Sequence, residues 1–137
     1  TERFLPHPPQ AIFQAFAHPE QLALWWGPAG FRNTFERFEF HPGGRWEFVM
    51  HGPDGQDYPN RARFEVLEAD RIVIRHVNAP HFTLTVQLQP ADGGTQLEWL
   101  QAFDDPQVAA AVRAICEPAN EQNLDRLAAL LSAGAAA

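Results

Sequence analysis

The sequence predicts an α+β domain in which one curved antiparallel sheet of about seven strands wraps around a long C-terminal helix. Three features of the chain lead to this fold class. Apolar residues recur at helical spacing in two short N-terminal segments, alternate with polar residues through the middle, and return to helical spacing over residues 106–131. Because an antiparallel sheet has an apolar face to bury, we expect the last helix to cover it.

The N-terminal part of the chain predicts a short strand followed by two short helices. Residues 1–5 form the strand, and the run from Gln10 to Phe16 has its apolar residues on one helical face. Pro19 suits the first turn of a second helix, because proline has no N–H to leave unpaired there. Glycine and proline within residues 27–30 end that helix.

Alternation of apolar and polar residues from Asn33 to Gln101 predicts about six further strands in an antiparallel meander. Segment 82–89 is the most regular, since its hydrophobic side chains share one face and its polar side chains the other. The strands are joined by turns rich in glycine, proline and acidic residues, which we place at residues 41–44, 52–55, 68–70 and 92–94.

The final helix has a clear start. Asp105 supplies an N-cap carboxylate and Pro106 occupies the first helical position. Apolar residues then recur every three or four positions to Leu131, which gives a helix long enough to cross the sheet. Pro118 is expected to kink this helix or divide it in two.

Length and composition favour one soluble domain over residues 1–137. The net charge of −7 and the scattering of all ten arginines among acidic residues argue against a nucleic-acid partner. No apolar run approaches the ~18 residues that span a bilayer, so we expect no membrane association. The single cysteine, Cys116, and the absence of a signal-like start favour the cytoplasm.

The sequence offers few residues for covalent catalysis or metal binding. The chain has no lysine, and its only serine, Ser132, lies in the alanine-rich tail, so we expect no catalytic nucleophile. The six histidines are dispersed without metal-ligand spacing and Cys116 has no partner cysteine. We therefore predict no catalytic residue, no metal and no other cofactor.

Several motifs together resemble a known family. Leu24-Trp25-Trp26-Gly27-Pro28, the run from Phe40 to Trp46, Gly52-Pro53-Asp54-Gly55, and Glu65-Val66 with Arg71-Ile72-Val73 are similar, in order and spacing, to the activator of heat shock protein 90 ATPase homologue family. The resemblance implies membership of the START-like (SRPBCC) superfamily and its helix-grip fold. It also implies a chaperone as a possible partner, and relatives in the superfamily include polyketide cyclases and dehydratases.

An excess of aromatic side chains on the predicted inner face favours a pocket for a small hydrophobic or aromatic ligand between sheet and helix. A core completely filled by these rings is the alternative. The predicted ligand-binding residues are Trp26, Phe38, Phe40, Trp46, Phe48, Phe64, His76, Phe82, Trp99, Gln101, Ile115 and Asn120.

His76 and Gln101 stand out because alternation places each polar side chain on the apolar face of its strand. A ligand-orienting role and a purely structural hydrogen bond both fit this placement. The leading interpretation is a non-catalytic binding protein. The alternatives are a chaperone-interacting module and a cyclase-like enzyme in which His76 moves protons. An exposed tryptophan near Gly27-Pro28 would suit a homodimer contact.

Overall fold

The computed structural model describes residues 1–136, which form seven strands and three helices. Their order is β1 (Glu2–Leu5), α1 (Pro9–Ala17), α2 (Pro19–Trp25), β2 (Arg32–Phe38), β3 (Arg45–His51), β4 (Asp57–Glu68), β5 (Arg71–His76), β6 (Phe82–Ala91), β7 (Gly94–Phe103) and α3 (Pro106–Ala136). The predicted fold class and the two short helices before β2 are confirmed.

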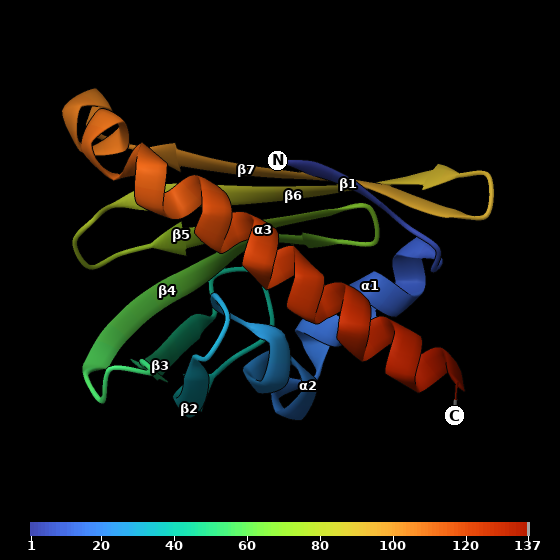
Figure 1. The fold of residues 1–137 in the computed structure, drawn as a ribbon, viewed down its shortest axis with the longest axis horizontal. Coiled ribbons are helices and arrows are strands. Elements are labelled where there is room, and N and C mark those ends of the chain that lie inside the picture. Colours follow the sequence, from blue (N-terminus) through green and yellow to red (C-terminus); the bar gives the residue numbers. More distant parts are fainter. Residues whose placement is uncertain (137) are drawn as a thin grey trace.

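All seven strands belong to one antiparallel sheet with the order β1-β7-β6-β5-β4-β3-β2 (Figure 1). The meander from β2 to β7 joins sequence neighbours, and β1 closes the far edge by pairing with β7. Register shifts in β2 between Phe35 and Arg37 and in β4 between Phe64 and Val66 mark bulges. Such bulges increase the local bend of a strand, and so help the sheet to curve.

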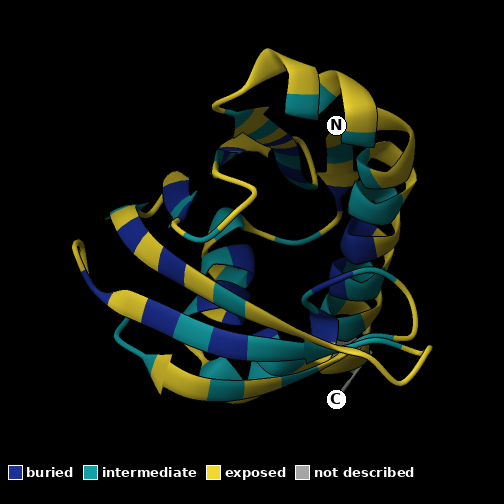
Figure 2. Ribbon diagram, turned by 90° about the vertical axis from the view of Figure 1, so that its left-hand side faces the viewer, coloured by how far each residue is buried: buried dark blue, intermediate teal, exposed yellow. Residues whose placement is uncertain are grey.

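The three helices lie on the same face of the sheet, with α3 running across it (Figure 1). Figure 2 shows buried and exposed residues alternating along the strands, as expected when one face is covered and the other meets solvent. Trp46 and Phe48, for example, are 0% and 3% exposed, whereas Arg45 between the turn and Trp46 is exposed. No helix within residues 1–136 combines the length and the apolar character that crossing a membrane requires.

Helix α3 begins where the sequence predicts. The Asp105 carboxylate accepts a hydrogen bond from the backbone N–H of Gln107 over 2.8 Å, the contact of an N-cap. The helix continues through Pro118 to Ala136, and its first turns run in a different direction from the remainder (Figure 1). A bend is thus confirmed, but the expected alternative of two separate helices is not, because the flanking turns keep the helix continuous.

Strand β4 runs from Asp57 to Glu68. Pro59 lies near its start and pairs with Val49 of β3. Pairing with β5 starts only at Ala62, so Pro59 has no strand partner on its other side. Proline is tolerated in a strand at such an edge, where a missing N–H costs no ladder hydrogen bond.

The core is solid where α1, α2 and the second half of α3 meet the sheet. Ile12, Phe16, Leu22, Leu124 and Leu127 are all 0% exposed there. The Nε1–H of Trp25 donates to the Ala15 carbonyl over 3.0 Å and so ties α2 to α1. This half of the molecule matches the filled-core alternative.

Candidate functional site

A cavity of about 300 Å³ lies between the sheet and the part of α3 around Pro118. Its walls are mostly apolar and come from five strands, α3 and two loops. The residues that line it are Trp26, Gly27, Pro28, Phe48, Met50, Asn60, His76, Pro80, Phe82, Leu84, Trp99, Gln101, Phe103, Val112, Cys116, Ala119, Asn120 and Asn123. The sheet and helix therefore do enclose a hollow, beside the solid half of the core.

Seven of the residues predicted from the sequence meet at this cavity. They are Trp26, Phe48, His76, Phe82, Trp99, Gln101 and Asn120. Trp26 and Trp99 face one another as tilted rings with centroids 5.8 Å apart. Their placement agrees with the expectation from alternation, whereas their contact with a ligand stays a prediction.

Four predicted ring positions do not line the cavity, and placing them there was wrong. Phe38, Phe40, Trp46 and Phe64 pack on one another in a continuous cluster beneath β2, β3 and β4. The Trp46 and Phe64 rings stack with centroids 5.7 Å apart at 9°, and Phe40 meets Phe64 edge-on at 5.1 Å. Ring contacts of this kind fill the space that a ligand would need.

Placing Ile115 at the cavity was also wrong, because its side chain is 71% exposed. The face of α3 that meets the cavity carries Val112, Cys116 and Ala119, at steps of four and three. Ile115 is one residue from Cys116 and hence about 100° around the helix. Its apolar spacing from Val112 and Ala119 is equally regular, so the sequence pattern does not distinguish the two faces.

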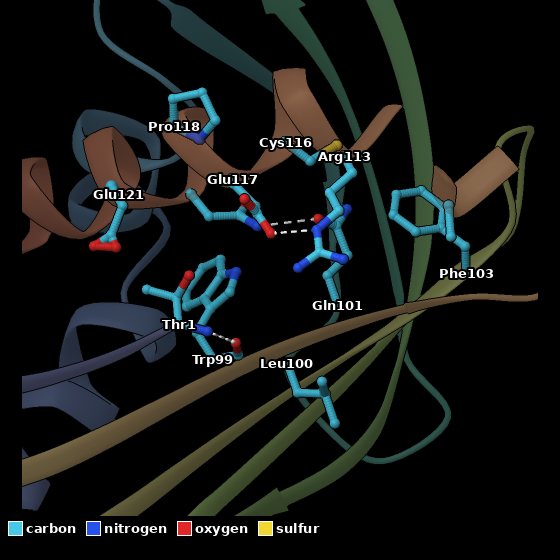
Figure 3. A pocket seen from close by; sticks show the side chains of 12 residues that line it. Thr1, Trp99, Leu100, Gln101, Phe103, Arg113, Cys116, Glu117, Pro118 and Glu121 are labelled. Carbon is cyan, nitrogen blue, oxygen red and sulfur yellow. Dashed lines mark hydrogen bonds and ion pairs between the residues drawn. The ribbon is translucent and has the colours of Figure 1, made fainter. Parts of the chain in front are cut away.

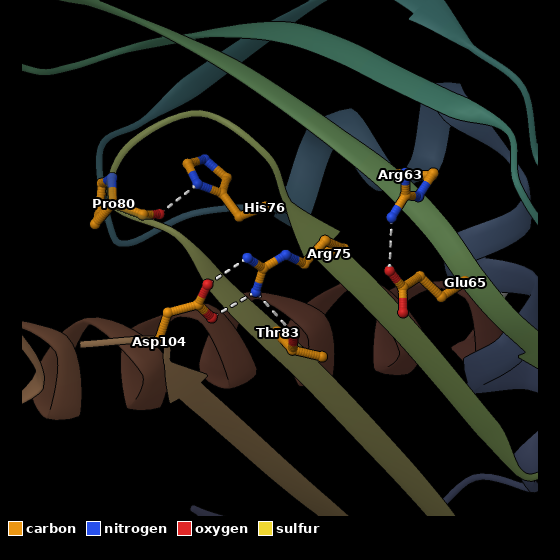
Figure 4. Close-up of polar contacts among 7 residues, drawn as sticks. All are labelled: Arg63, Glu65, Arg75, His76, Pro80, Thr83 and Asp104. Carbon is orange, nitrogen blue, oxygen red and sulfur yellow. Dashed lines mark hydrogen bonds and ion pairs between the residues drawn. The ribbon is translucent and has the colours of Figure 1, made fainter. Parts of the chain in front are cut away.

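His76 forms the polar part of the sheet wall and is 6% exposed. Its Nδ1 lies 2.8 Å from the Pro80 carbonyl oxygen (Figure 4), and its Nε2 lies 2.7 Å from Asn60 Oδ1. The ring stacks on Phe82 with centroids 4.5 Å apart at 7°. Burial lowers the pKa of His76, while hydrogen bonds to the carbonyls of Pro80 and Asn78 act in the opposite direction.

The helix side of the cavity carries amide side chains. Asn120 donates to Gln101 Oε1 over 3.2 Å, and Asn123 donates to the Trp25 carbonyl over 2.8 Å. The indole N–H of Trp99 is buried and has no hydrogen-bond partner among the described residues. The same holds for the indole of Trp46 in the aromatic cluster.

Arg126 fixes the loop that forms one end of the cavity, and sequence reasoning missed it. Its Nη1 donates to the carbonyls of Trp26, Gly27 and Pro28, each at 3.0 Å. Its Nη2 donates to the carbonyls of Leu24 at 2.7 Å and Phe31 at 3.0 Å. We call these five contacts the Arg126 clamp. Burial lowers the pKa of this guanidinium.

Gly27 lies in this loop against Met50 of β3. Its φ is +94°, a region that favours glycine, and a Cβ added there would lie 2.7 Å from Met50 Cε. The Gly-Pro pair that ends α2 in the sequence thus also forms part of the cavity wall.

A second hollow, of about 520 Å³, lies between β7 and the first half of α3 (Figure 3). Its walls include Leu100, Arg113, Glu117 and Glu121, and it shares the Gln101–Asn120 wall with the cavity. Arg113 and Glu117 already pair with one another over 2.6 Å and both are exposed. The walls of this groove carry charged side chains, so the cavity is the better site for an apolar ligand.

Two further expectations concern metals and a dimer. Within residues 1–136, no three His, Cys, Asp or Glu side chains gather as metal ligands would. The tryptophan expected at the surface near Gly27-Pro28 is not there, since Trp25 is 1% exposed and Trp26 is half-buried against the cavity. A homodimer stays a prediction without that support.

Comparisons with known proteins agree with this architecture. A protein from Nitrosomonas europaea matches with a TM-score of 0.90 and 23% identity over 100% of this chain and 95% of its own. A protein from Rhodobacter sphaeroides matches with a TM-score of 0.84 and 27% identity over 96% and 89%. The AHSA1 protein from Silicibacter pomeroyi matches with a TM-score of 0.78 and 20% identity over 98% and 96%.

A search among functionally curated proteins returns no significant match. The profile described as "Activator of Hsp90 ATPase homolog 1-like protein" matches residues 6–132, which include both short helices, the whole meander and most of α3. The chain therefore belongs to the family of Activator of Hsp90 ATPase homolog 1-like proteins.

Proposed function

We propose that the protein binds a small hydrophobic or aromatic molecule in the cavity between α3 and the sheet, and does so without catalysing a reaction. The observation that carries this proposal is the cavity itself, about 300 Å³ in volume and lined mainly by aromatic and aliphatic side chains. Ligand sites of small molecules have this character, with a few polar groups that orient the ligand.

The ring geometry favours a flat ligand. Trp26, Trp99 and Phe82 all contribute to the wall, and Phe82 lies at 5.3 Å from Phe103. A flat ring bound among these side chains can make the offset or edge-on contacts that aromatic groups prefer.

The polar groups support binding over catalysis. Both ring nitrogens of His76 already face protein oxygen atoms. The described residues that line the cavity include no Asp, Glu, Lys or Arg that would act with it. General acid–base catalysis is favoured by a second titratable group that orients the imidazole, which this lining lacks.

The test uses the neutral fluorescent probe N-phenyl-1-naphthylamine. We expect saturable binding to the unaltered protein, and a loss of affinity of about tenfold or more in Ala119→Trp, because the new indole fills the cavity. Ala114→Trp is the matched control, since Ala114 is exposed on the same helix and does not line the cavity. Absence of binding, or equal binding by the two folded variants, would refute the proposal.

A chaperone-regulating role is a second proposal, supported by the description of the family alone. Its test is the ATPase rate of a heat shock protein 90 chaperone from the same source at saturating protein. An increase would support the role, and an unchanged rate would eliminate it. Ala119→Trp separates the two proposals, because it blocks the cavity, so an increase of the ATPase rate that persists in this variant does not depend on the ligand site.

A further inference from the structure

We infer that the ligand of the cavity is an acid, namely an aromatic or aliphatic molecule with one carboxylate, whose charge is balanced by a proton that His76 takes up on binding. This inference rests on the proposed function and adds the chemical class of the ligand. It is carried by the arrangement of hydrogen-bond acceptors around His76.

Both ring nitrogens of His76 face oxygen acceptors. Nδ1 lies 2.8 Å from the Pro80 carbonyl and Nε2 lies 2.7 Å from Asn60 Oδ1. A neutral imidazole has only one N–H, so one nitrogen lone pair must then point at an oxygen. The imidazolium form donates to both oxygens and removes this conflict.

Turning the Asn60 amide over does not help the neutral ring. Asn60 Nδ2 donates to the Tyr58 carbonyl over 2.8 Å, which fixes the orientation of the amide. In the opposite orientation Nδ2 would serve His76, but Oδ1 would face the Tyr58 carbonyl oxygen. In either orientation of the amide, a neutral imidazole therefore leaves two hydrogen-bond acceptors facing one another, whereas the imidazolium leaves none.

The described residues that line the cavity do not provide a counter-charge for that imidazolium. Arg75 on the same strand and His81 in the following loop oppose a positive charge, and Arg75 is itself paired with Asp104 over 2.6 Å. The neighbouring elements contribute Asn60 from β4, Phe82 from β6 and, across the cavity, the Cys116 thiol from α3.

None of the described residues that line the cavity is Asp or Glu. A buried charge is unfavourable unless it is paired. The site therefore has donors and acceptors arranged for a charged ring but lacks the anion that would stabilise it. A ligand carboxylate beside His76 and Asn60 supplies that anion, either next to the ring or in place of Asn60 at Nε2.

Binding and protonation are then linked. The affinity for an acid should rise as the pH falls from the His76 pKa of the bound protein to that of the free protein, by up to about tenfold per pH unit. The ligand carboxylate itself stays ionised over this range. A neutral amide of the same shape should bind with an affinity that does not depend on pH.

The experiment compares 2-naphthoate with 2-naphthamide. Titration calorimetry in two buffers with different heats of ionisation counts the protons taken up, and NMR of the imidazole resonances follows His76 with and without the probe. We expect proton uptake with naphthoate only, and a rise in the His76 pKa on its binding. His41→Gln is the control, because His41 is exposed and does not line the cavity.

Two variants make the test specific. His76→Gln should bind both probes with no dependence on pH. Asn60→Asp places a fixed carboxylate at Nε2, so it should raise the His76 pKa without ligand and remove the preference for naphthoate.

Naphthoate and naphthamide binding equally, with the His76 pKa unmoved, would refute the acid inference and leave the binding function standing. If N-phenyl-1-naphthylamine and both naphthyl probes fail to bind, the binding function is refuted with it. If naphthoate binds more tightly at low pH and His76→Gln retains that dependence, the assignment to His76 is wrong.

Discussion

Replacing Arg126 by methionine tests whether the Arg126 clamp holds the cavity wall. Methionine keeps most of the apolar stem of the side chain but removes the five donated contacts to the end of α2 and to the loop between α2 and β2. Four of these contacts are part-buried and one is exposed. Because Nη1 has only two hydrogens for its three carbonyls, the part-buried contacts amount to about three full hydrogen bonds, and at about 1 kcal/mol for each we expect a loss of about 3 kcal/mol in the free energy of unfolding.

Urea denaturation followed by tryptophan fluorescence measures this loss, and hydrogen exchange locates it. Protection should fall in residues 24–31, while the meander keeps its protection. Arg113→Met is the matched control on the same helix, because Arg113 is exposed and pairs only with Glu117. The reasoning fails if Arg126→Met loses less than about 1 kcal/mol, or no more than the Arg113 variant does.

Three further predictions concern α3, His76 and Gly27. Leu127→Ala should cost about 2–5 kcal/mol in urea denaturation, whereas Ile115→Ala should cost less than about 0.5 kcal/mol, because the first is 0% and the second 71% exposed. Burial keeps the His76 pKa below its unfolded value, so the unfolded state binds more protons and the ligand-free protein should lose stability as the pH falls below about 6.5, levelling off below the folded pKa. The His76→Gln variant should lose less stability over the same pH range, as measured by urea denaturation at each pH. Gly27→Ala should lower the free energy of unfolding by about 1–3 kcal/mol, since φ is +94° and the new Cβ displaces Met50; an unchanged melting temperature would contradict the strain assigned to this position.

Alternation in the sequence predicts the sheet well because each strand buries one face. Residues such as Trp46 and Phe48 are two apart and both buried, as a period of two requires. Boundaries are less predictable. The start of β4 depends on whether its edge is paired, and Pro59 is acceptable only because β5 does not reach it.

The candidate site is only half predictable for a related reason. Alternation shows which face a ring lies on but not whether its neighbours leave space beside it. Phe38 and Phe82 have equivalent patterns, yet Phe38 packs against Phe35 at 5.7 Å and Phe82 lies at the cavity. Phe38 lies on β2, which α2 contacts, whereas Phe82 lies on β6 at the cavity that faces the part of α3 around Pro118.

The polar framework of the site depends on contacts between distant parts of the chain. Asn60 has the pattern of an ordinary edge residue, and only the approach of His76 from β5 gives its amide a role. Arg126 lies between Asn123 and Leu127, both on the buried side of α3. An arginine at such a position cannot be solvated freely, so it is a signal that the guanidinium meets buried acceptors.

That signal identifies a need for acceptors but not their location. The carbonyls that Arg126 meets belong to the end of α2 and to the following loop, about one hundred residues earlier, where Gly27 has a positive φ. The same loop provides Trp26, Gly27 and Pro28 to the cavity wall. A change that loosens the Arg126 clamp should therefore alter the shape of the cavity as well as the stability of the fold, so the proposed ligand binding is expected to weaken together with stability although Arg126 does not line the cavity.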